Sequence, residues 1–144
     1  MSKKITIAID AMGGLNAPKK NIEGLKIFLN KNIKKDDFEI RLFGNKSILE
    51  NELSTLKVTS EKIKIIHTDE VVSDEESPLT AVKNSKNTSM WNSVKSQIDG
   101  DADITLSAGN TGVLLVISRM ILKMINEVSK PALAGLWPSK KGMS

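Results

Sequence analysis

Two short glycine-bearing stretches carry the residues of this sequence that are best suited to chemistry. The first, DAMGG, runs from Asp10 to Gly14, and the second, SAGNTG, runs from Ser107 to Gly112. Each follows a short apolar run and precedes a longer segment with helical periodicity. Glycine permits backbone conformations and close approaches that a Cβ atom would block. Both stretches are therefore predicted to be tight loops between a strand and a helix.

The chemistry that such loops favour is the binding of a small anion. Asn110 and Thr111 lie where a helix is expected to begin, and the free N–H groups of a helix N-terminus attract anions. The side chains of Ser107, Asn110 and Thr111 add hydrogen-bond donors, and Asp10 ends the preceding strand of the first loop. The alternative is that both loops are ordinary turns with N-caps, because short glycine motifs also occur by chance. Two such loops together favour a site for an anion such as phosphate.

Alternating strand and helix patterns position these loops. Strands are predicted at residues 5–10, 38–43, 62–67, 102–106 and 132–137. Helices are predicted at residues 18–30, 48–56, 80–98 (with a break near 84–88) and 113–125, and residues 69–78 are expected to form an exposed loop. This order implies an α/β fold of three layers, αβα, with a mainly parallel, Rossmann-like sheet between helices. Ligands of such sheets bind at the carboxyl ends of the strands, where both glycine loops fall.

The composition is that of a soluble globular protein, with 40% hydrophobic and 26% charged residues. Cysteine is absent, which excludes disulfides, thiolate metal sites and cysteine nucleophiles. The net charge of +4 comes almost wholly from scattered lysines, and aromatic residues make up only 3%, so a solvated surface is favoured over a nucleic-acid site. The longest apolar run, residues 113–125, contains Arg119 and Lys123 and is too short for a membrane span. It is apolar around most of its circumference and is predicted to be buried, in the core or at a subunit interface.

Three strings together resemble the hallmark segments of the PlsX family of phosphate acyltransferases, which act in bacterial phospholipid synthesis. They are IAIDAMGG (residues 7–14), SAGNTG (residues 107–112) and KPALAGLWP (residues 130–138). The intervening strings IIHTDEVV, SP, AVK and KNTSM follow in the order and spacing of the family. The resemblance extends over residues 4–142, and this combination of motifs is far more specific than either loop alone.

The resemblance implies a fold and an activity. The family fold is similar to that of phosphotransacetylases and isocitrate-dehydrogenase-like enzymes. Its members transfer a fatty acyl group from acyl carrier protein to inorganic phosphate, which gives an acyl phosphate, and no cofactor is implied. The resemblance further implies a homodimer in the full-length protein and a cytoplasmic location, with peripheral association at the inner face of the cell membrane. Phosphate is itself the nucleophile, so the site has to hold it against the thioester and stabilise the developing oxyanion.

The family motifs imply the substrate-binding residues one by one, whereas the catalytic residues stay unassigned. The implied substrate-binding residues are Asp10, Gly13 and Gly14 in the first motif, Lys86 and Ser89 in a K-x-S-S-M segment, and Ser107, Gly109, Asn110, Thr111 and Gly112 in the second motif. Thr88 replaces the first serine of the K-x-S-S-M segment. Lys86 could bring positive charge to phosphate or to the carrier. The alternative, an ordinary solvated lysine on a helix, is equally favoured. His67 ends an apolar strand and is interpreted as structural.

Three departures from the family pattern accompany these matches. Leu15 stands where aspartate is usual, and Lys83 and Lys130 stand where arginine is usual, although lysine cannot reproduce a bidentate contact. Family members are also much longer, so residues 1–144 are interpreted as the N-terminal part of one domain, inactive by itself. Two other classes of function stay open: a phosphotransacetylase-like enzyme that uses acyl-CoA, and a non-catalytic module that binds phosphate or an acyl carrier.

Overall fold

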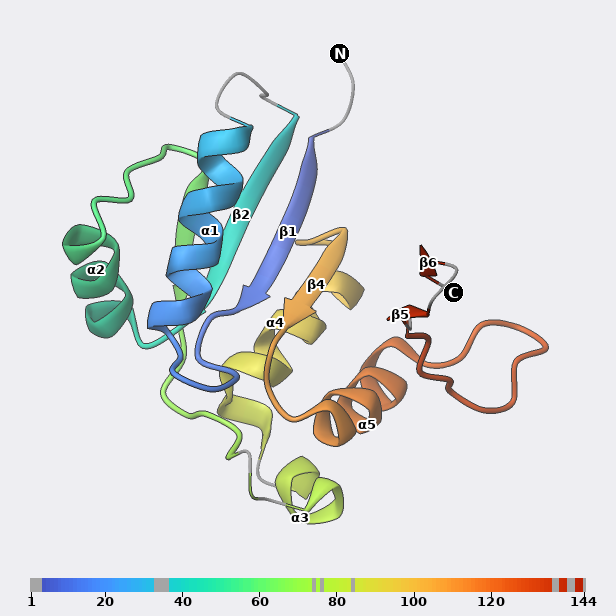
Figure 1. The fold of residues 1–144 in the computed structure, drawn as a ribbon. Coiled ribbons are helices and arrows are strands. Elements are labelled where there is room, and N and C mark those ends of the chain that lie inside the picture. The colour runs from blue at the N-terminus through green and yellow to red at the C-terminus, as the bar shows by residue number, and fades with distance from the viewer. Residues whose placement is uncertain are drawn as a thin grey trace.

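In a computed structural model of the chain, the structure describes residues 4–32, 37–73, 75, 77–83, 85–135, 138–139 and 142–143. The first half contains β1 (Ile5–Asp10), α1 (Lys19–Lys31), β2 (Phe38–Gly44), α2 (Lys46–Thr55) and β3 (Ile63–His67). The second half contains α3 (Pro78–Lys83), the 3₁₀ turn η1 (Ser85–Asn87), α4 (Ser89–Ile98), β4 (Ile104–Ser107) and α5 (Thr111–Leu122). A two-residue antiparallel pair, β5 (Pro138–Ser139) and β6 (Gly142–Met143), follows (Figure 1).

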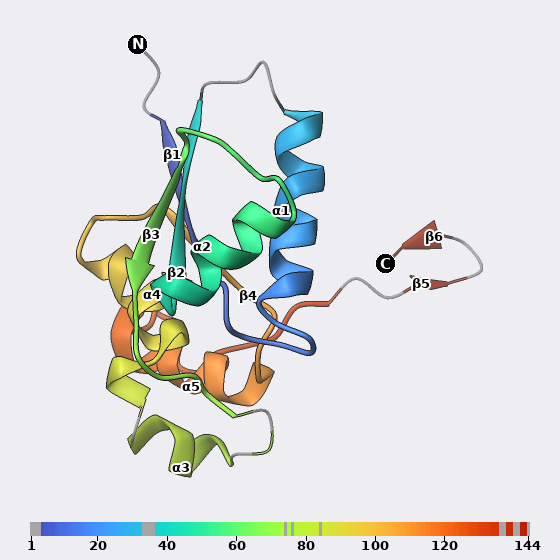
Figure 2. The ribbon, with the colours of Figure 1, turned by 90° about the vertical axis from the view of Figure 1, so that its left-hand side faces the viewer.

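The four longer strands form one parallel sheet in the order β3-β2-β1-β4. In its register, Asp10 at the end of β1 pairs with Phe43 on β2 and with Ser107 on β4, so these strand ends lie level at one edge. The helices α1 and α2 cover one face of the sheet and α4 covers the other (Figure 2). The predicted α/β fold, with helices on both faces of a parallel sheet, is confirmed.

The strand order reverses between β1 and β4. From β1 the chain passes through α1 to β2 and then to β3, whereas after α4 it returns to the other side of β1 as β4. The loop after β1 therefore leads into α1 on one face, and the loop after β4 leads into α5, which packs against α4 on the other face (Figure 1). Such a reversal leaves a crevice outside the carboxyl ends of the two strands, where ligands of open α/β sheets bind.

Two hydrophobic clusters hold the elements on either side of this reversal. The larger cluster lies under α1 and α2 and includes Ile22, Leu25, Ile40, Leu42 and Leu49. The second cluster joins α4 to α5 through Met90, Val94, Val113 and Ile117. Burial of these side chains supplies most of the stabilisation of a domain of this size, and it fixes both helices that follow the glycine loops.

The helix after SAGNTG differs in extent and burial from its prediction over residues 113–125. It begins at Thr111, because the Asn110 side chain caps it, and it ends at Leu122, before Lys123 with its φ of 63°. Val113 and Ile117 are fully buried, but Met120 is 53% exposed. Within the described residues α5 is therefore buried on one side only, against α3 and α4, and the alternative of burial at a subunit interface stays a prediction.

The predicted break in the helical segment 80–98 is confirmed. Helix α3 ends at Lys83 and α4 begins at Ser89, where the Thr88 side chain accepts a hydrogen bond from the Trp91 N–H as the N-cap. Threonine is among the residues preferred at this capping position, as serine is. In the described segments, no helix combines the length and the apolar character needed to cross a membrane.

The prediction of a fifth strand at residues 132–137 is wrong for residues 132–135, which have no regular structure. Residues 136 and 137 lie outside the described residues. A strand needs a hydrogen-bonded neighbour, and β4 pairs only with β1 in the described part of the chain. The apolar sequence alone predicted a strand that finds no partner here.

Candidate functional site

The carboxylate of Asp10 lies at the centre of the crevice between β1 and β4. Its side chain is 1% exposed. Its Oδ1 accepts a hydrogen bond from the Ser89 hydroxyl at 2.6 Å, and its Oδ2 accepts one from the Ser107 hydroxyl at 2.7 Å. The backbone N–H groups of Met12 and Gly13 also donate to it. One buried carboxylate thus connects the end of β1, the start of α4 and the end of β4.

Burial raises the pKa of Asp10 above its ordinary value, because the ionised carboxylate loses its water. The four hydrogen bonds favour the ionised form and lower the pKa, but the effect of burial is the larger one. A buried carboxylate is costly unless it is paired or hydrogen-bonded. Here hydroxyl and backbone donors take the place that a basic side chain has in a buried ion pair.

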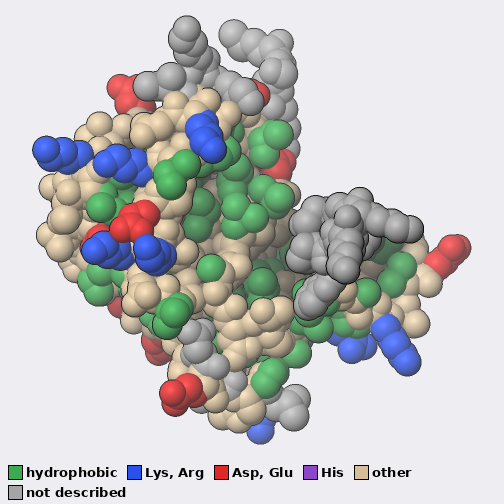
Figure 3. All heavy atoms as spheres, in the orientation of Figure 1, with side chains coloured by type: hydrophobic (Ala, Val, Ile, Leu, Met, Phe, Trp, Pro, Cys, Tyr) green, Lys and Arg blue, Asp and Glu red, His purple; other side chains and the backbone are tan. Residues whose placement is uncertain are grey.

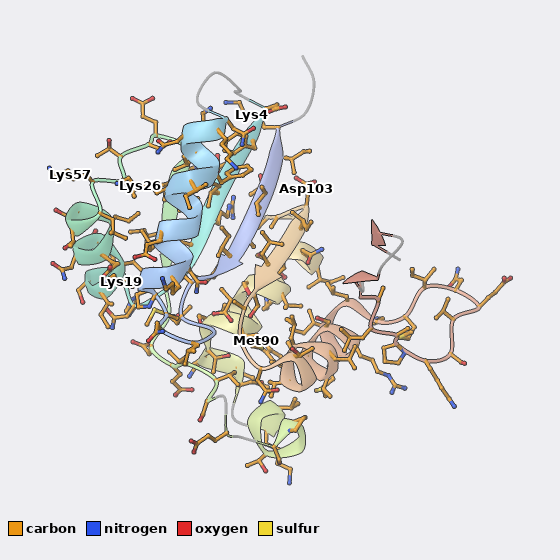
Figure 4. The ribbon with its side chains drawn as sticks, viewed as in Figure 1. Lys4, Lys19, Lys26, Lys57, Met90 and Asp103 are labelled. Atoms are coloured by element: carbon orange, nitrogen blue, oxygen red, sulfur yellow. The ribbon has the colours of Figure 1, made fainter. Side chains whose placement is uncertain are left out.

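Glycines allow the two loops to touch each other above this carboxylate. A Cβ atom on Gly13 would lie 2.4 Å from Asp10 Oδ2 and 3.1 Å from the Gly109 nitrogen. A Cβ on Gly109 would lie 3.3 Å from the Gly13 Cα and 2.8 Å from the Met90 Cε. Gly14 has a φ of 97°, and its Cβ would lie 2.5 Å from a backbone oxygen of the second loop. Figure 4 shows Met90 at the loop end of the sheet, close to where β4 leads into α5.

Side chains of the second loop fix its conformation and begin α5. The Ser107 hydroxyl oxygen accepts a hydrogen bond from the Gly109 N–H at 3.1 Å, while its proton is donated to Asp10. Asn110 Oδ1 accepts from the Val113 N–H at 3.1 Å. The N–H groups of Thr111 and Gly112 precede the first intrahelical hydrogen bonds, and they have no partner among the described residues. The start of α5 therefore presents two backbone donors at the crevice.

Lys86 and His67 lie apart from the two loops. Lys86 is on η1 with an exposed side chain, and its ammonium forms no hydrogen bond or ion pair with a described residue. His67, at the end of β3, accepts a hydrogen bond from the Lys46 N–H at 3.1 Å, and its other ring nitrogen lies 3.0 Å from Asp69 Oδ1. These contacts agree with a structural role for His67. In the described part of the chain, no group of His, Asp and Glu side chains is arranged to hold a metal ion.

Asn21 is a positioning residue that the sequence reasoning missed. Its amide nitrogen donates to the carbonyl oxygens of Ala11 and Gly13, both at 2.9 Å, and so ties the first loop to the helix that follows it. An asparagine in the first turn of a helix after a glycine loop is a recognisable signal, because short amide side chains commonly bond to nearby backbone.

The fold and this crevice define an open α/β protein whose two glycine loops meet where the strand order reverses. The family model described as "Fatty acid synthesis protein" matches residues 5–144. The chain belongs to this family.

Curated relatives agree with the family. The chain is 47% identical over 144 residues to a phosphate acyltransferase of Pelagibacter ubique (strain HTCC1062) and covers 42% of it. It is 34% identical over 145 residues to a phosphate acyltransferase of Rhodopseudomonas palustris (strain BisB5) and covers 40% of it. All of this chain is aligned in both comparisons, so it spans less than half the length of these relatives. The resemblance seen in the sequence is confirmed.

The close packing of the two loops predicts opposite effects of alanine at two glycines. Gly13→Ala forces a Cβ against Asp10 and should lower the free energy of unfolding by about 1–3 kcal/mol, the usual cost of overpacking. Gly24→Ala, within α1, meets nothing within 4 Å and should raise it by about 0.5–1 kcal/mol. Urea denaturation of both variants measures this. Equal effects would mean that the loops do not pack as described.

The raised pKa of Asp10 predicts how stability depends on pH. Because the folded state takes up this proton more readily than the unfolded state, the contribution of Asp10 is fully present below its unfolded-state pKa. It is lost as the pH rises through the folded-state pKa. The difference in unfolding free energy between the unchanged chain and Asp10→Asn should therefore grow as the pH falls toward 3.8, the ordinary value for this carboxyl. Denaturation curves at several pH values measure the difference, and a difference that shrinks on acidification contradicts the burial of Asp10.

Proposed function

We propose that this chain supplies the phosphate-binding part of an acyltransferase that moves a fatty acyl group from acyl carrier protein to inorganic phosphate. The family membership and the relatives named phosphate acyltransferase support this reaction. One structural observation carries the proposal: the start of α5, with two backbone donors, is held at the strand reversal by the Asp10–Ser107 hydrogen bond. Since the chain spans 42% of the Pelagibacter relative, the activity belongs to a protein that contains more than these residues.

The hydrogen bonds of Asp10 support different roles for the two loops in this proposal. The N–H groups of Met12 and Gly13 are already directed at the Asp10 carboxylate, which leaves the first loop without these donors for a second anion. The N–H groups of Thr111 and Gly112 have no such partner among the described residues, and the helix dipole favours an anion at this end. Phosphate therefore binds at the start of α5, and Asp10 acts as a positioning residue that sets the conformation of the second loop.

The proposed reaction needs no nucleophile from the protein. An oxygen of hydrogen phosphate attacks the thioester carbonyl carbon, a C–O bond forms and the C–S bond breaks. The carrier thiolate leaves with the electron pair of that bond, and the proton of hydrogen phosphate ends on its sulfur. The described residues contribute by holding the anion in one place and orientation, which is a large part of catalysis in bimolecular reactions.

A carrier partner fits the surface charge of the protein. Figure 4 shows Lys19, Lys26 and Lys57 on the side of the molecule formed by α1 and α2. Acyl carrier proteins are acidic, and a lysine-rich surface accelerates their encounter in a salt-dependent way. Lys86, exposed on η1, adds a further positive charge to the surface. We extend the proposal to a homodimer and to peripheral membrane association in the full-length protein, as the family resemblance implies.

The role of the α5 start can be tested by removing one backbone donor. Thr111 is the first helical residue, where proline is well tolerated, and the preceding Asn110 has a non-helical backbone (φ −56°, ψ 111°), so it avoids the helical conformation that proline disfavours in the residue before it. Thr111→Pro removes the N–H and should leave the melting temperature nearly unchanged. Turnover at limiting phosphate should fall by about a hundredfold, as for the loss of one preorganised donor. Thr111→Ala, which keeps the N–H, is the matched control.

The measurement uses a chimera in which this chain replaces the matched region of the Pelagibacter ubique phosphate acyltransferase. Acyl phosphate formation is followed at varied phosphate concentration with an acyl carrier protein thioester. Equal rates for Thr111→Pro and the unchanged chimera would exclude this donor from the phosphate site. Activity with acyl-CoA and none with the acyl carrier protein thioester would mean that acyl-CoA is the acyl donor.

A further inference from the structure

Among the described residues, nothing covers one face of the sheet between α1 and β4. A cavity of about 350 Å³ lies there, walled by apolar side chains that include Ile7, Ile9, Leu25, Phe28 and Leu106. Figure 3 shows hydrophobic side chains gathered on this face of the molecule. Leu106 is 50% exposed, although it lies within a strand of a parallel sheet, where both faces are normally covered.

The strand that borders this face is also unpaired along its outer edge. In the described part of the chain, β4 forms its ladder with β1 alone. Its other face is engaged, because the Thr105 hydroxyl donates to the Ser93 carbonyl of α4 at 3.0 Å. The exposed side chains of Ile104 and Leu106 thus lie beside a free edge, a combination that natural proteins cover or pair.

A glycine inside α1 indicates what kind of occupant fits. Gly24 lines the same cavity, and a Cβ at this position would meet nothing within 4 Å. Glycine within a helix is unfavourable relative to alanine, and no contact in the described residues requires it here. Its absent side chain lets another backbone approach α1 closely, which favours a packed polypeptide segment over a small apolar ligand.

We propose that this face, bounded by Gly24, Phe28, Ile104 and Leu106, is the docking surface for the part of phosphate acyltransferases that lies outside the region matched by this chain. More than half of the Pelagibacter relative falls outside that region. The cavity reaches the loop residues Ser107 and Ala108, so the docked segment lies against the crevice that contains Asp10. This inference rests on the length of the relatives and on the exposed face, and it does not depend on the proposed phosphate chemistry.

The absence of cysteine allows a direct test by chemical labelling. Leu106→Cys is introduced into the isolated chain and into the chimera with the Pelagibacter relative, whose added part is made free of cysteine. The maleimide labelling rate of Leu106→Cys should fall at least about tenfold in the chimera, because thiol reactivity follows exposure. Ile98→Cys, on α4 and 56% exposed, is the matched control and should react equally in both proteins.

A second measurement covers the case in which a cysteine variant misfolds. Leu106→Lys should leave the melting temperature of the isolated chain nearly unchanged, because the side chain is half exposed there, and should lower that of the chimera clearly. Equal labelling of Leu106→Cys in both proteins, or equal melting behaviour of Leu106→Lys, overturns the proposal. Protection that appears in the isolated chain with rising chain concentration, or on addition of dodecanoate, also overturns it in favour of a second copy or an acyl chain.

Discussion

The buried carboxylate of Asp10 is the group on which the arrangement of the crevice depends. Its hydrogen-bond donors come from the loop after β1, from the first residue of α4 and from the last residue of β4, which are far apart in the sequence. A buried charge cannot lose such partners cheaply, so the three segments are fixed relative to one another. The hydroxyl oxygen of Ser107 in turn accepts a hydrogen bond from the Gly109 N–H. This bond fixes the second loop, which leads directly into α5.

The strand reversal explains why two glycine loops meet at this carboxylate. The central strand β1 has β2 on one side and β4 on the other, and the loops after β1 and β4 lead to opposite faces of the sheet. Both loops still have to pass over the same carboxyl end, where Gly13 and Gly109 leave room for their backbones to touch. The glycines thus serve the contact between the loops directly, and in the proposed function they also bring the start of α5 to the place where phosphate binds.

Local patterns predicted most of the fold. Alternation of isoleucines located β1, and the weak helical pattern near residues 84–88 located the break between α3 and α4. The absence of a strand at residues 132–135 could not be predicted, because a strand depends on a pairing partner elsewhere in the fold, and the end of α5 at Leu122 was not visible in an apolar pattern that continues to residue 125. Motif matching named Asp10, Ser89 and Ser107 but could not show that their side chains bond to one another, since that contact spans 79 and 97 residues of sequence. Asn21 was missed because its role depends on the path of the loop before it.

The division of roles between the two loops is tested most directly by a ¹H–¹⁵N NMR titration of the chain with inorganic phosphate. Saturable shifts of the Thr111 and Gly112 amide signals are expected, because these N–H groups lie at the N-terminus of α5 and have no hydrogen-bond partner among the described residues. The Met12 and Gly13 signals should stay in place, since their N–H groups remain bonded to Asp10. Saturable shifts at Met12 and Gly13, with none at Thr111 and Gly112, would show that phosphate occupies the first loop and would contradict the positioning role of Asp10.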